Sequence, residues 1–233
     1  MRQAMIDPTP QRDPIPIADA LPARAIFHEL SIPRLYAYHR ALAGAQAEGK
    51  RTVTSHALAE LLDHTISSAQ IRKDLCALGP LGRRGRGYAI NPLVEQLALV
   101  LGLGHDWRIA IVGFGFLGHA FATFITARER RFEVVAIFDQ APSVIGQEWQ
   151  GMTVSDSAQL DRVVAQRGCN IGVIAVPAPV APAIAQRLVN AGVQAILNFA
   201  PTPLHLRTPV MVRNIDLAGE LTILTHHLSC EAR

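Results

Sequence analysis

A glycine-rich turn between two short apolar runs constrains the fold of this chain more than any other feature. The first run, Trp107–Val112, is rich in β-branched residues and leads directly into Gly113-Phe-Gly-Phe-Leu-Gly118. A helical stretch follows, and a second apolar run ends at Asp139, 21 residues beyond Gly118. Strand, glycine turn, helix, strand and acid, in this order, predict the first half of a doubly wound parallel sheet that holds a dinucleotide.

Each part of this turn has a predicted role. Gly113 permits a tight turn, Gly115 lets the backbone approach a pyrophosphate, and Gly118 lets the helix pack against the strand. The free N–H groups at the helix N-terminus favour that anion. Asp139 is spaced to accept hydrogen bonds from both ribose hydroxyls, and it would repel a 2′-phosphate. The pattern therefore predicts NAD(H) as the cofactor in preference to NADP(H).

Further strand and helix segments extend the sheet. Strands are expected over residues 169–176, 194–198 and 210–215, with a helix over 178–191. Ligands bind at the carboxyl ends of parallel strands, so the turn, the acid and the segments after two later strands should line one crevice. The predicted cofactor-binding residues are Gly113, Phe114, Gly115, Phe116, Leu117, Gly118, Asp139, Val176, Pro177 and Asn198.

Little chain remains for a separate catalytic domain. The sequence offers no Ser/His/Asp arrangement and no metal-ligand spacing, and the candidate bases are His119, His205, His226 and His227. A dehydrogenase needs a substrate site and a group that moves a proton. We therefore predict no catalytic residue and no metal, and we expect the nucleotide to be a signal rather than a reactant.

The N-terminal half of the chain has a different pattern, typical of short helices followed by a hairpin. Ser31 is expected to cap a first helix, a second helix covers about 53–62, and Ser67 caps a third that runs to about Leu78. Two short helices around a tight turn are typical of a helix-turn-helix. The segment 79–90, with four glycines, predicts a basic β-hairpin, or wing.

The third helix and the wing carry the basic residues of this half. Ile71, Leu75 and Leu78 form a predicted buried stripe, and Lys73 lies on the opposite face. Between residues 72 and 86 there are five basic residues and one acidic residue, on a chain of net charge +3. Such a patch suggests a nucleic-acid partner. The predicted DNA-binding residues are Ser67, Ser68, Gln70, Arg72, Lys73, Arg83, Arg84 and Arg86.

Composition indicates the cellular compartment in which the protein works. The three cysteines lie far apart in the sequence, which favours a reducing compartment. The longest apolar run, near Leu97–Leu103, is too short to span a membrane, and residues 1–16 carry four prolines and no apolar signal-peptide core. A cytoplasmic protein that does not bind membranes is expected.

Four stretches of this chain form a highly specific combination, namely Ser67-Ser-Ala-Gln-Ile-Arg-Lys-Asp-Leu75, Gly85-Arg-Gly-Tyr88, Val112-Gly-Phe-Gly-Phe-Leu-Gly118 and Asn198-Phe-Ala-Pro201. With these stretches, the chain resembles the Rex family of bacterial redox-sensing transcriptional repressors. The resemblance runs in order over about residues 32–225. The resemblance implies a homodimer that binds double-stranded operator DNA when NADH is low and leaves it when NADH binds. By position it also implies that Arg40 and Asp216 link the two domains.

The expected organisation is an α/β chain with an N-terminal winged helix-turn-helix domain followed by a Rossmann-type doubly wound parallel sheet. The predicted segments are a flexible extension over 1–30, a DNA-binding domain over 31–92, a linker over 93–106, an NAD(H)-binding domain over 107–215 and a C-terminal helix over 216–233 that contacts a second subunit. The chain departs from the family at Phe124, where a tyrosine is common.

Three alternatives remain open at this point. A CoA-binding module would bind CoA and ignore NADH, and a small NAD(P)-dependent enzyme would turn over a substrate. A constitutive DNA-binding protein would ignore every nucleotide. The wing and the helix-turn-helix speak against the enzyme, and Asp139 favours an NAD(H)-responsive repressor over the other two.

Overall fold

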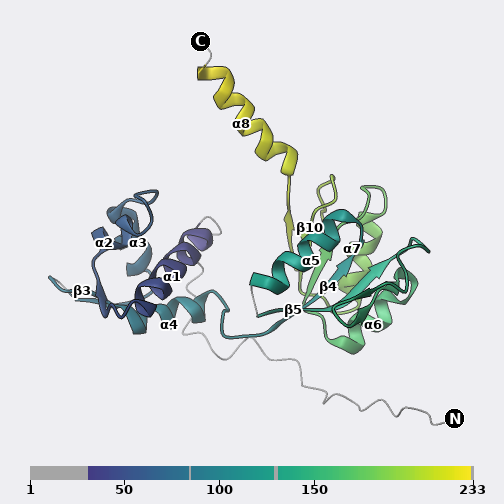
Figure 1. Cartoon of the computed structure of the whole chain (residues 1–233), viewed down its shortest axis with the longest axis horizontal. Coiled ribbons are helices and arrows are strands. Elements are labelled where there is room, and N and C mark those ends of the chain that lie inside the picture. Colours follow the sequence, from purple (N-terminus) through teal and green to yellow (C-terminus); the bar gives the residue numbers. More distant parts are fainter. Residues whose placement is uncertain (1–30, 84, 129–130, 232–233) are drawn as a thin grey trace, which may run out of the picture. The chain divides into compact units, whose positions relative to one another are not determined.

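The computed structural model describes residues 31–83, 85–128 and 131–231, and the chain divides into two compact units between His105 and Asp106 (Figure 1). The expected extension over 1–30 and the predicted DNA contact Arg84 lie outside the described residues. Each unit has a hydrophobic core of its own. The fold class predicted from the sequence, a winged helix followed by a doubly wound parallel sheet, is confirmed.

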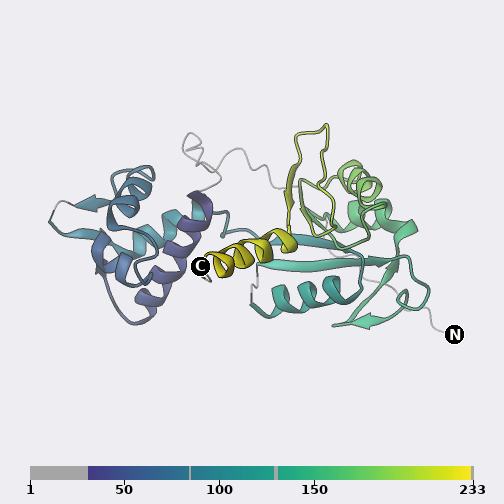
Figure 2. The same cartoon turned by 90° about the horizontal axis from the view of Figure 1, so that it is seen from above.

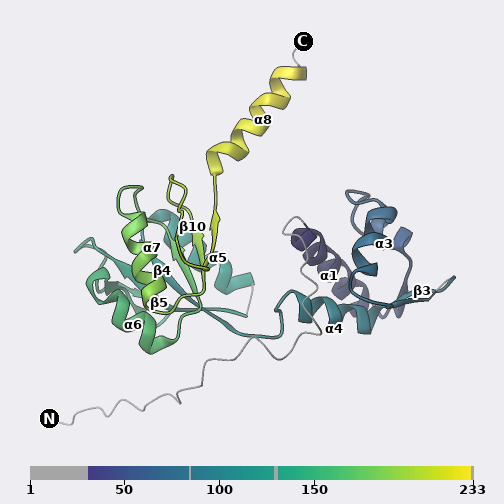
Figure 3. The ribbon, with the colours of Figure 1, turned by 180° about the vertical axis from the view of Figure 1, so that it is seen from behind.

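The first unit is a winged helix (Figure 3). Its central strand β3 pairs antiparallel with β1 on one side and with β2 on the other. The turn between the second and third helices uses two left-handed residues, Asp63 and His64. The elements in chain order are α1 (Ile32–Ala47), β1 (Thr52–Val53), α2 (Ser55–Glu60), α3 (Ser68–Cys76), β2 (Gly82–Arg83), β3 (Gly87–Ala89) and α4 (Ile90–Val100).

Helical periodicity builds the core of this unit. The predicted stripe on α3 is confirmed, because Ile71 and Leu75 are fully buried and Leu78 nearly so. Residues 93–100, expected to belong to a linker, instead form the body of α4. The reason is a second stripe, in which Leu93 and Leu97 follow Ile90 into the same core at helical spacing.

Of the two predicted helix caps in this unit, one is confirmed and the other is wrong. The Ser67 hydroxyl accepts a hydrogen bond from the Gln70 N–H at 3.2 Å, as expected of an N-cap. The expectation for Ser31 is wrong, because its backbone is already helical and its hydroxyl caps nothing. It accepts a 3.2 Å hydrogen bond from the Arg34 guanidinium instead.

The second unit contains a six-stranded sheet in which every pairing is parallel, in the order β11-β10-β9-β4-β5-β8 (Figure 1). Its strands are β4 (Trp107–Val112), β5 (Phe132–Asp139), β8 (Ser155–Asp156), β9 (Ile171–Ile174), β10 (Ala195–Asn198) and β11 (Met211–Asn214). A two-stranded hairpin, β6 (Glu148–Trp149) and β7 (Met152–Thr153), lies beside it. The helices are α5 (Phe116–Arg128), α6 (Leu160–Arg167), α7 (Ala181–Asn190) and α8 (Leu217–Glu231), with a 3₁₀ turn at Ser157–Gln159.

Alternating residues of the central strand bury both faces of this sheet. Ala110 and Val112 of β4 pack in the cluster that includes α6 and α7. Ile109 and Ile111 pack in the opposite cluster, with α5 and the hairpin. From β4 the chain runs outward through β5 to β8, then returns to β9 on the other side of β4. This reversal between β4 and β9 is the topological switch point at which doubly wound sheets bind ligands.

The last helix stands apart from the rest of the second unit. Expected over 216–233, it spans Leu217–Glu231 in the described residues and extends beyond the end of β11, as two views show (Figures 1 and 2). Leu217, Leu221 and Leu228 on this helix are all more than half exposed. In the part of the chain that the structure describes, no helix is both long and apolar enough to cross a membrane.

Candidate functional site

The strand register brings the predicted nucleotide site together at one edge of the sheet. Val112, the last residue of β4, lies opposite Phe138 of β5 and Ile174 of β9. Asn198 of β10 also lies opposite Ile174. Four strands therefore end at the same level, and the segments that follow them are neighbours.

The glycines of the turn meet different surroundings. Gly113 has a φ of +92°, and a Cβ there would collide with the carbonyl oxygen of Ala175, after β9. A Cβ on Gly118 would collide with the carbonyl oxygen of Gly113, so the helix start sits directly on the turn. A Cβ on Gly115 would have no atom within 4 Å. The open side of the turn is therefore at Gly115, where a pyrophosphate would need to approach.

Asp139 lies directly beside this turn. One carboxylate oxygen, Oδ2, accepts a 2.6 Å hydrogen bond from the Phe114 N–H. The other, Oδ1, accepts from the N–H groups of Gln140 and Ala141 at 2.7 and 2.8 Å. Since a carboxylate oxygen can accept two hydrogen bonds, Oδ2 keeps one acceptor position beyond the Phe114 bond. That position suits a ribose hydroxyl at the mouth of the turn.

The other predicted cofactor-binding residues differ in how far their side chains are exposed. The Phe114 ring is buried, and its centroid lies 5.3 Å from that of the His119 ring and 6.0 Å from that of the Trp149 ring. Phe116 is fully exposed at the start of α5, and Leu117 beside it is 40% exposed. Val176 is half-buried and Pro177 is exposed, both in the segment after β9.

Asn198 has its side chain engaged within the protein. It is fully buried, and its amide nitrogen donates to the Thr202 carbonyl and to Asn214 Oδ1, both at 2.8 Å. Its Oδ1 accepts from the Ala200 N–H at 3.0 Å. Both amide hydrogens are used, so the residue fixes the shape of the loop after β10. Asn214, which completes this network from β11, was not predicted from the sequence.

The exposed face of α3 carries the predicted DNA-binding cations. Arg72 and Lys73 are both exposed there. The Arg72 guanidinium donates to the hydroxyls of Ser55 and Ser68 at 3.1 and 3.4 Å, at the first turns of α2 and α3. Ser67, the cap of α3, is exposed as well.

The wing is shaped by its glycines. Gly85 and Gly87 have φ values of +78° and +76°, and a Cβ on Gly87 would collide with the backbone of β1. Arg83 belongs to β2, and Arg86 is exposed in the turn that follows. The hairpin therefore presents at least one predicted cation at its tip.

Gln70, the remaining predicted DNA contact, belongs to a polar cluster that sequence reasoning missed. Its amide nitrogen donates to Asp74 Oδ1 at 2.7 Å, and Asp74 is only 6% exposed. The Arg34 guanidinium donates to both carboxylate oxygens, at 2.8 and 3.0 Å, and the Tyr38 hydroxyl donates to Oδ2 at 2.8 Å. Desolvation alone would raise the pKa of Asp74, but the hydrogen bonds from Arg34, Tyr38 and Gln70 hold it below its ordinary value.

The two residues assigned by resemblance to interdomain signalling belong to different units. Arg40 is exposed on α1. Asp216 precedes α8 and accepts a 2.9 Å hydrogen bond from the Gly219 N–H, which caps that helix. Within residues 31–83, 85–128 and 131–231, no three His, Cys, Asp or Glu side chains are grouped to hold a metal ion.

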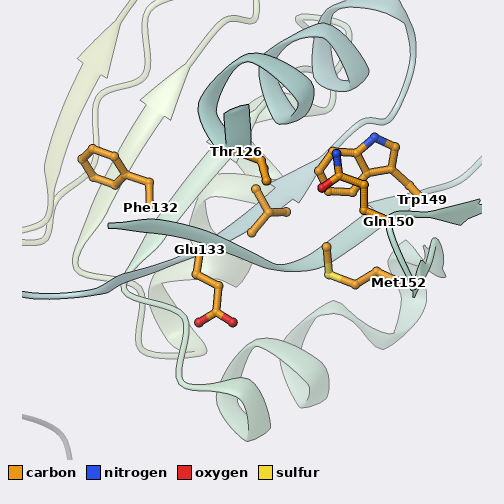
Figure 4. Close-up of a pocket in the computed structure, with 7 residues that line it drawn as sticks. Thr126, Phe132, Glu133, Trp149, Gln150 and Met152 are labelled. Atoms are coloured by element: carbon orange, nitrogen blue, oxygen red, sulfur yellow. The ribbon is translucent and has the colours of Figure 1, made fainter. Parts of the chain in front are cut away.

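A separate open pocket of about 540 Å³ lies near the amino end of β5 (Figure 4). Its lining comes from the end of α5, the start of β5 and the β6–β7 hairpin, namely Thr126, Phe132, Glu133, Val134, Trp149, Gln150 and Met152. Glu133 is the only acidic or basic side chain among them, and the predicted nucleotide site lies at the other end of the strand. The pocket therefore adds nothing to the candidate site.

Comparisons with known proteins agree with this two-part design. A family described as "Putative DNA-binding protein N-terminus" matches residues 29–76, and one described as "CoA binding domain" matches residues 105–202. The redox-sensing transcriptional repressor Rex 1 of Thermotoga maritima is 41% identical over 84% of this chain and 92% of its own length. The repressor Rex of Desulfitobacterium hafniense is 42% identical over 86% of this chain and 94% of its own.

Solved structures give the same result. The crystal structure of RSP with β-NAD⁺ and operator DNA matches with a TM-score of 0.83 at 31% identity, covering 90% of this chain and 95% of that one. RSP with β-NADH matches with a TM-score of 0.77 at 30% identity, covering 90% and 97%. RSP is described as a Rex-family repressor. Proteins of this family are transcriptional repressors rather than enzymes. By its sequence and by its fold, the chain belongs to the Rex family of redox-sensing transcriptional repressors.

Proposed function

We propose that this protein binds operator DNA through α3 and the wing when NADH is scarce, and that NADH bound at the β4 turn releases it. The observation that carries the proposal is the placement of Asp139, whose carboxylate is hydrogen-bonded to the glycine turn beside its open side at Gly115. A winged helix with exposed cations in the same chain supplies the surface that binds DNA. The activity belongs in the cytoplasm, where operator DNA and the NAD(H) pool meet.

Release of DNA by NADH requires that the nucleotide binds one arrangement of the protein more tightly than the other. NADH can shift the protein between a DNA-competent and an incompetent arrangement only if it binds the incompetent one better than NAD⁺ does. The dihydronicotinamide ring is neutral, whereas the oxidised ring is a cation. Burial among apolar groups therefore costs less for NADH.

A homodimer would supply such an apolar environment, and α8 offers a surface for it. Leu217, Leu221, Leu224 and Leu228 recur at helical spacing and are all more than half exposed. On α5, Phe116 is fully exposed and Phe124 is 58% exposed. Exposed apolar stripes of this kind mark interfaces with other chains. We assign both helices to contacts between two copies.

Charge in the leucine stripe of α8 is expected to break the dimer. Leu221→Glu combined with Leu224→Glu should give a monomer by light scattering and should weaken binding to an inverted-repeat operator by at least about tenfold, because two half-sites are then no longer bound together. Thr222→Glu, on the other side of the same helix, is the matched control and should leave both unchanged. A dimeric double variant would contradict the assignment of α8.

Asp139 is expected to set the choice of nucleotide. Asp139→Ala removes both the ribose acceptor and the Phe114 bond, so NADH affinity should fall by about tenfold and the preference for NADH over NADPH should shrink. Asp139→Asn keeps an oxygen for the Phe114 N–H but loses the charge that repels a 2′-phosphate. Calorimetric titration with both nucleotides checks this. Unchanged affinities in both variants would remove Asp139 from the site.

The two cations of α3 are expected to act differently on DNA. Arg72, held by hydroxyls at two helix starts, suits a phosphate, so Arg72→Ala should lower the slope of log affinity against log salt by about one. Lys73→Ala should weaken operator binding by about tenfold and leave random duplex binding nearly unchanged. Arg162→Ala, an exposed cation on α6, is the control. Full operator affinity in both α3 variants would exclude α3 as the reading helix.

Fluorescence anisotropy on a labelled inverted-repeat operator tests the proposed function itself. At fixed salt, NADH should release the DNA, whereas NAD⁺, NADPH and CoA should have little effect. Release by CoA alone would favour the CoA-binding module, in keeping with the family that matches residues 105–202. DNA binding that no nucleotide disturbs would contradict redox sensing.

A further inference from the structure

We propose that Arg34, Tyr38 and Gln70 form a positioning clamp on Asp74 that fixes the rotation of the recognition helix α3, and that operator specificity depends on it. The inference rests on the proposed function, since it concerns how α3 reads DNA. None of these four side chains needs to touch the DNA. They act by setting where Arg72 and Lys73, the neighbours of Asp74 in sequence, point.

The clamp joins two halves of the first unit. Helix α1 packs mainly on α4, whereas α3 packs mainly on α2. Asp74 lies on the buried side of α3, and two of its hydrogen-bond donors, Arg34 and Tyr38, come from α1. The clamp therefore connects these two helix pairs through hydrogen bonds of defined geometry.

The carboxylate of Asp74 is saturated by this arrangement. Oδ2 accepts from Arg34 Nε and from the Tyr38 hydroxyl, both at 2.8 Å. Oδ1 accepts from the Arg34 Nη2 and Gln70 Nε2 groups at 3.0 and 2.7 Å. Two bonds at each oxygen match the acceptor capacity of an ionised carboxylate. The planar guanidinium binds both oxygens at once, which fixes orientation as well as distance.

The apolar stripe of α3 cannot supply the same constraint. Contacts of Ile71 and Leu75 with the core are non-directional, so they define the angular position of α3 less sharply than hydrogen bonds of fixed geometry do. The same rotation would swing Lys73 across the face that reads base edges, because side chains on a helix are fixed to its angular position. Contacts to phosphates, which carry no sequence information, tolerate such a change better.

The experiment separates positioning from stability. Tyr38→Phe removes one donor while keeping the ring, and the double variant Arg34→Met with Asp74→Leu replaces the ion pair by apolar groups that can fill the same space. Leu42→Ala, in the same core and outside the clamp, is the control that only destabilises. Anisotropy is measured on the operator and on a scrambled duplex, at a temperature at which circular dichroism shows every variant folded.

The double variant should bind the operator roughly tenfold more weakly, Tyr38→Phe a few-fold more weakly, and both should bind the scrambled duplex within about twofold of the unaltered protein. Leu42→Ala should keep the unaltered ratio of the two affinities, and NADH affinity should stay unchanged in all. An unaltered operator-to-scrambled ratio in the folded double variant would overturn the clamp, as would an equal loss in Leu42→Ala. If the unaltered protein itself does not discriminate the operator, the proposed function fails first.

Discussion

Gly118→Ala is expected to weaken NADH binding by at least about 100-fold, which corresponds to the loss of one or two hydrogen bonds to an anion. A methyl group at this position would overlap the carbonyl oxygen of Gly113. The start of α5 must then move away from the turn, and its N–H groups no longer converge on the pyrophosphate. Isothermal titration with NADH measures the loss.

Gly115→Ala is the matched variant that keeps the fold. No atom lies within 4 Å of a Cβ there, so thermal stability should be unchanged within about 2 °C. The methyl group would nevertheless occupy the space through which the backbone approaches the nucleotide. NADH affinity should fall by about tenfold or more. Normal NADH affinity in Gly115→Ala would show that the nucleotide does not lie on this side of the turn.

Asp74→Ala is expected to lower the free energy of unfolding of the first unit by about 2–4 kcal/mol, as for other buried, multiply bonded carboxylates. The change leaves the buried Tyr38 hydroxyl without this acceptor, and it uncouples Arg34 from α3. Urea unfolding followed by circular dichroism measures the difference. Asp161→Ala is the control, because Asp161 also pairs with an arginine, Arg187, but is half exposed. This substitution should lower the free energy of unfolding by under about 1 kcal/mol.

The same contribution should depend on pH in a defined direction. The hydrogen bonds hold the pKa of Asp74 in the folded state below its ordinary value of 3.8. Its stabilising effect is therefore complete above that ordinary value and is lost as the pH falls through the lower folded pKa. The gap in stability between the unaltered protein and Asp74→Ala should be constant near neutral pH and should close below about pH 4. A gap that persists in acid would show that the carboxylate acts through packing alone.

What the sequence predicts well is local. The glycine turn, the acid after the next strand and the stripe on α3 are patterns within about 30 residues, and the fold class follows from them. The hairpin β6–β7 and the strand β8 were missed, because two-residue strands show no periodicity. Residues 93–100 of α4 were taken for a linker, although Leu93 and Leu97 repeat at helical spacing.

What the sequence hides is contact between distant segments. Arg34 and Asp74 are 40 residues apart, so no local sequence pattern pairs them. Asn198 was taken for a nucleotide contact, and the structure gives both of its amide hydrogens partners within the protein, one of them 16 residues away on Asn214. Buried polar side chains need partners. An acid within an apolar stripe, such as Asp74 between Ile71 and Leu75, was the available signal for a hidden ion pair.

The most direct test of redox sensing is reciprocal. The dissociation constant of NADH is measured for the free protein and for the protein saturated with operator, and that of the operator is measured with and without saturating NADH. If the nucleotide site and the DNA-binding surface are coupled, both ratios must be equal and well above one, and the ratio for NAD⁺ must be much smaller. Tight binding of both ligands with ratios of one would contradict the account.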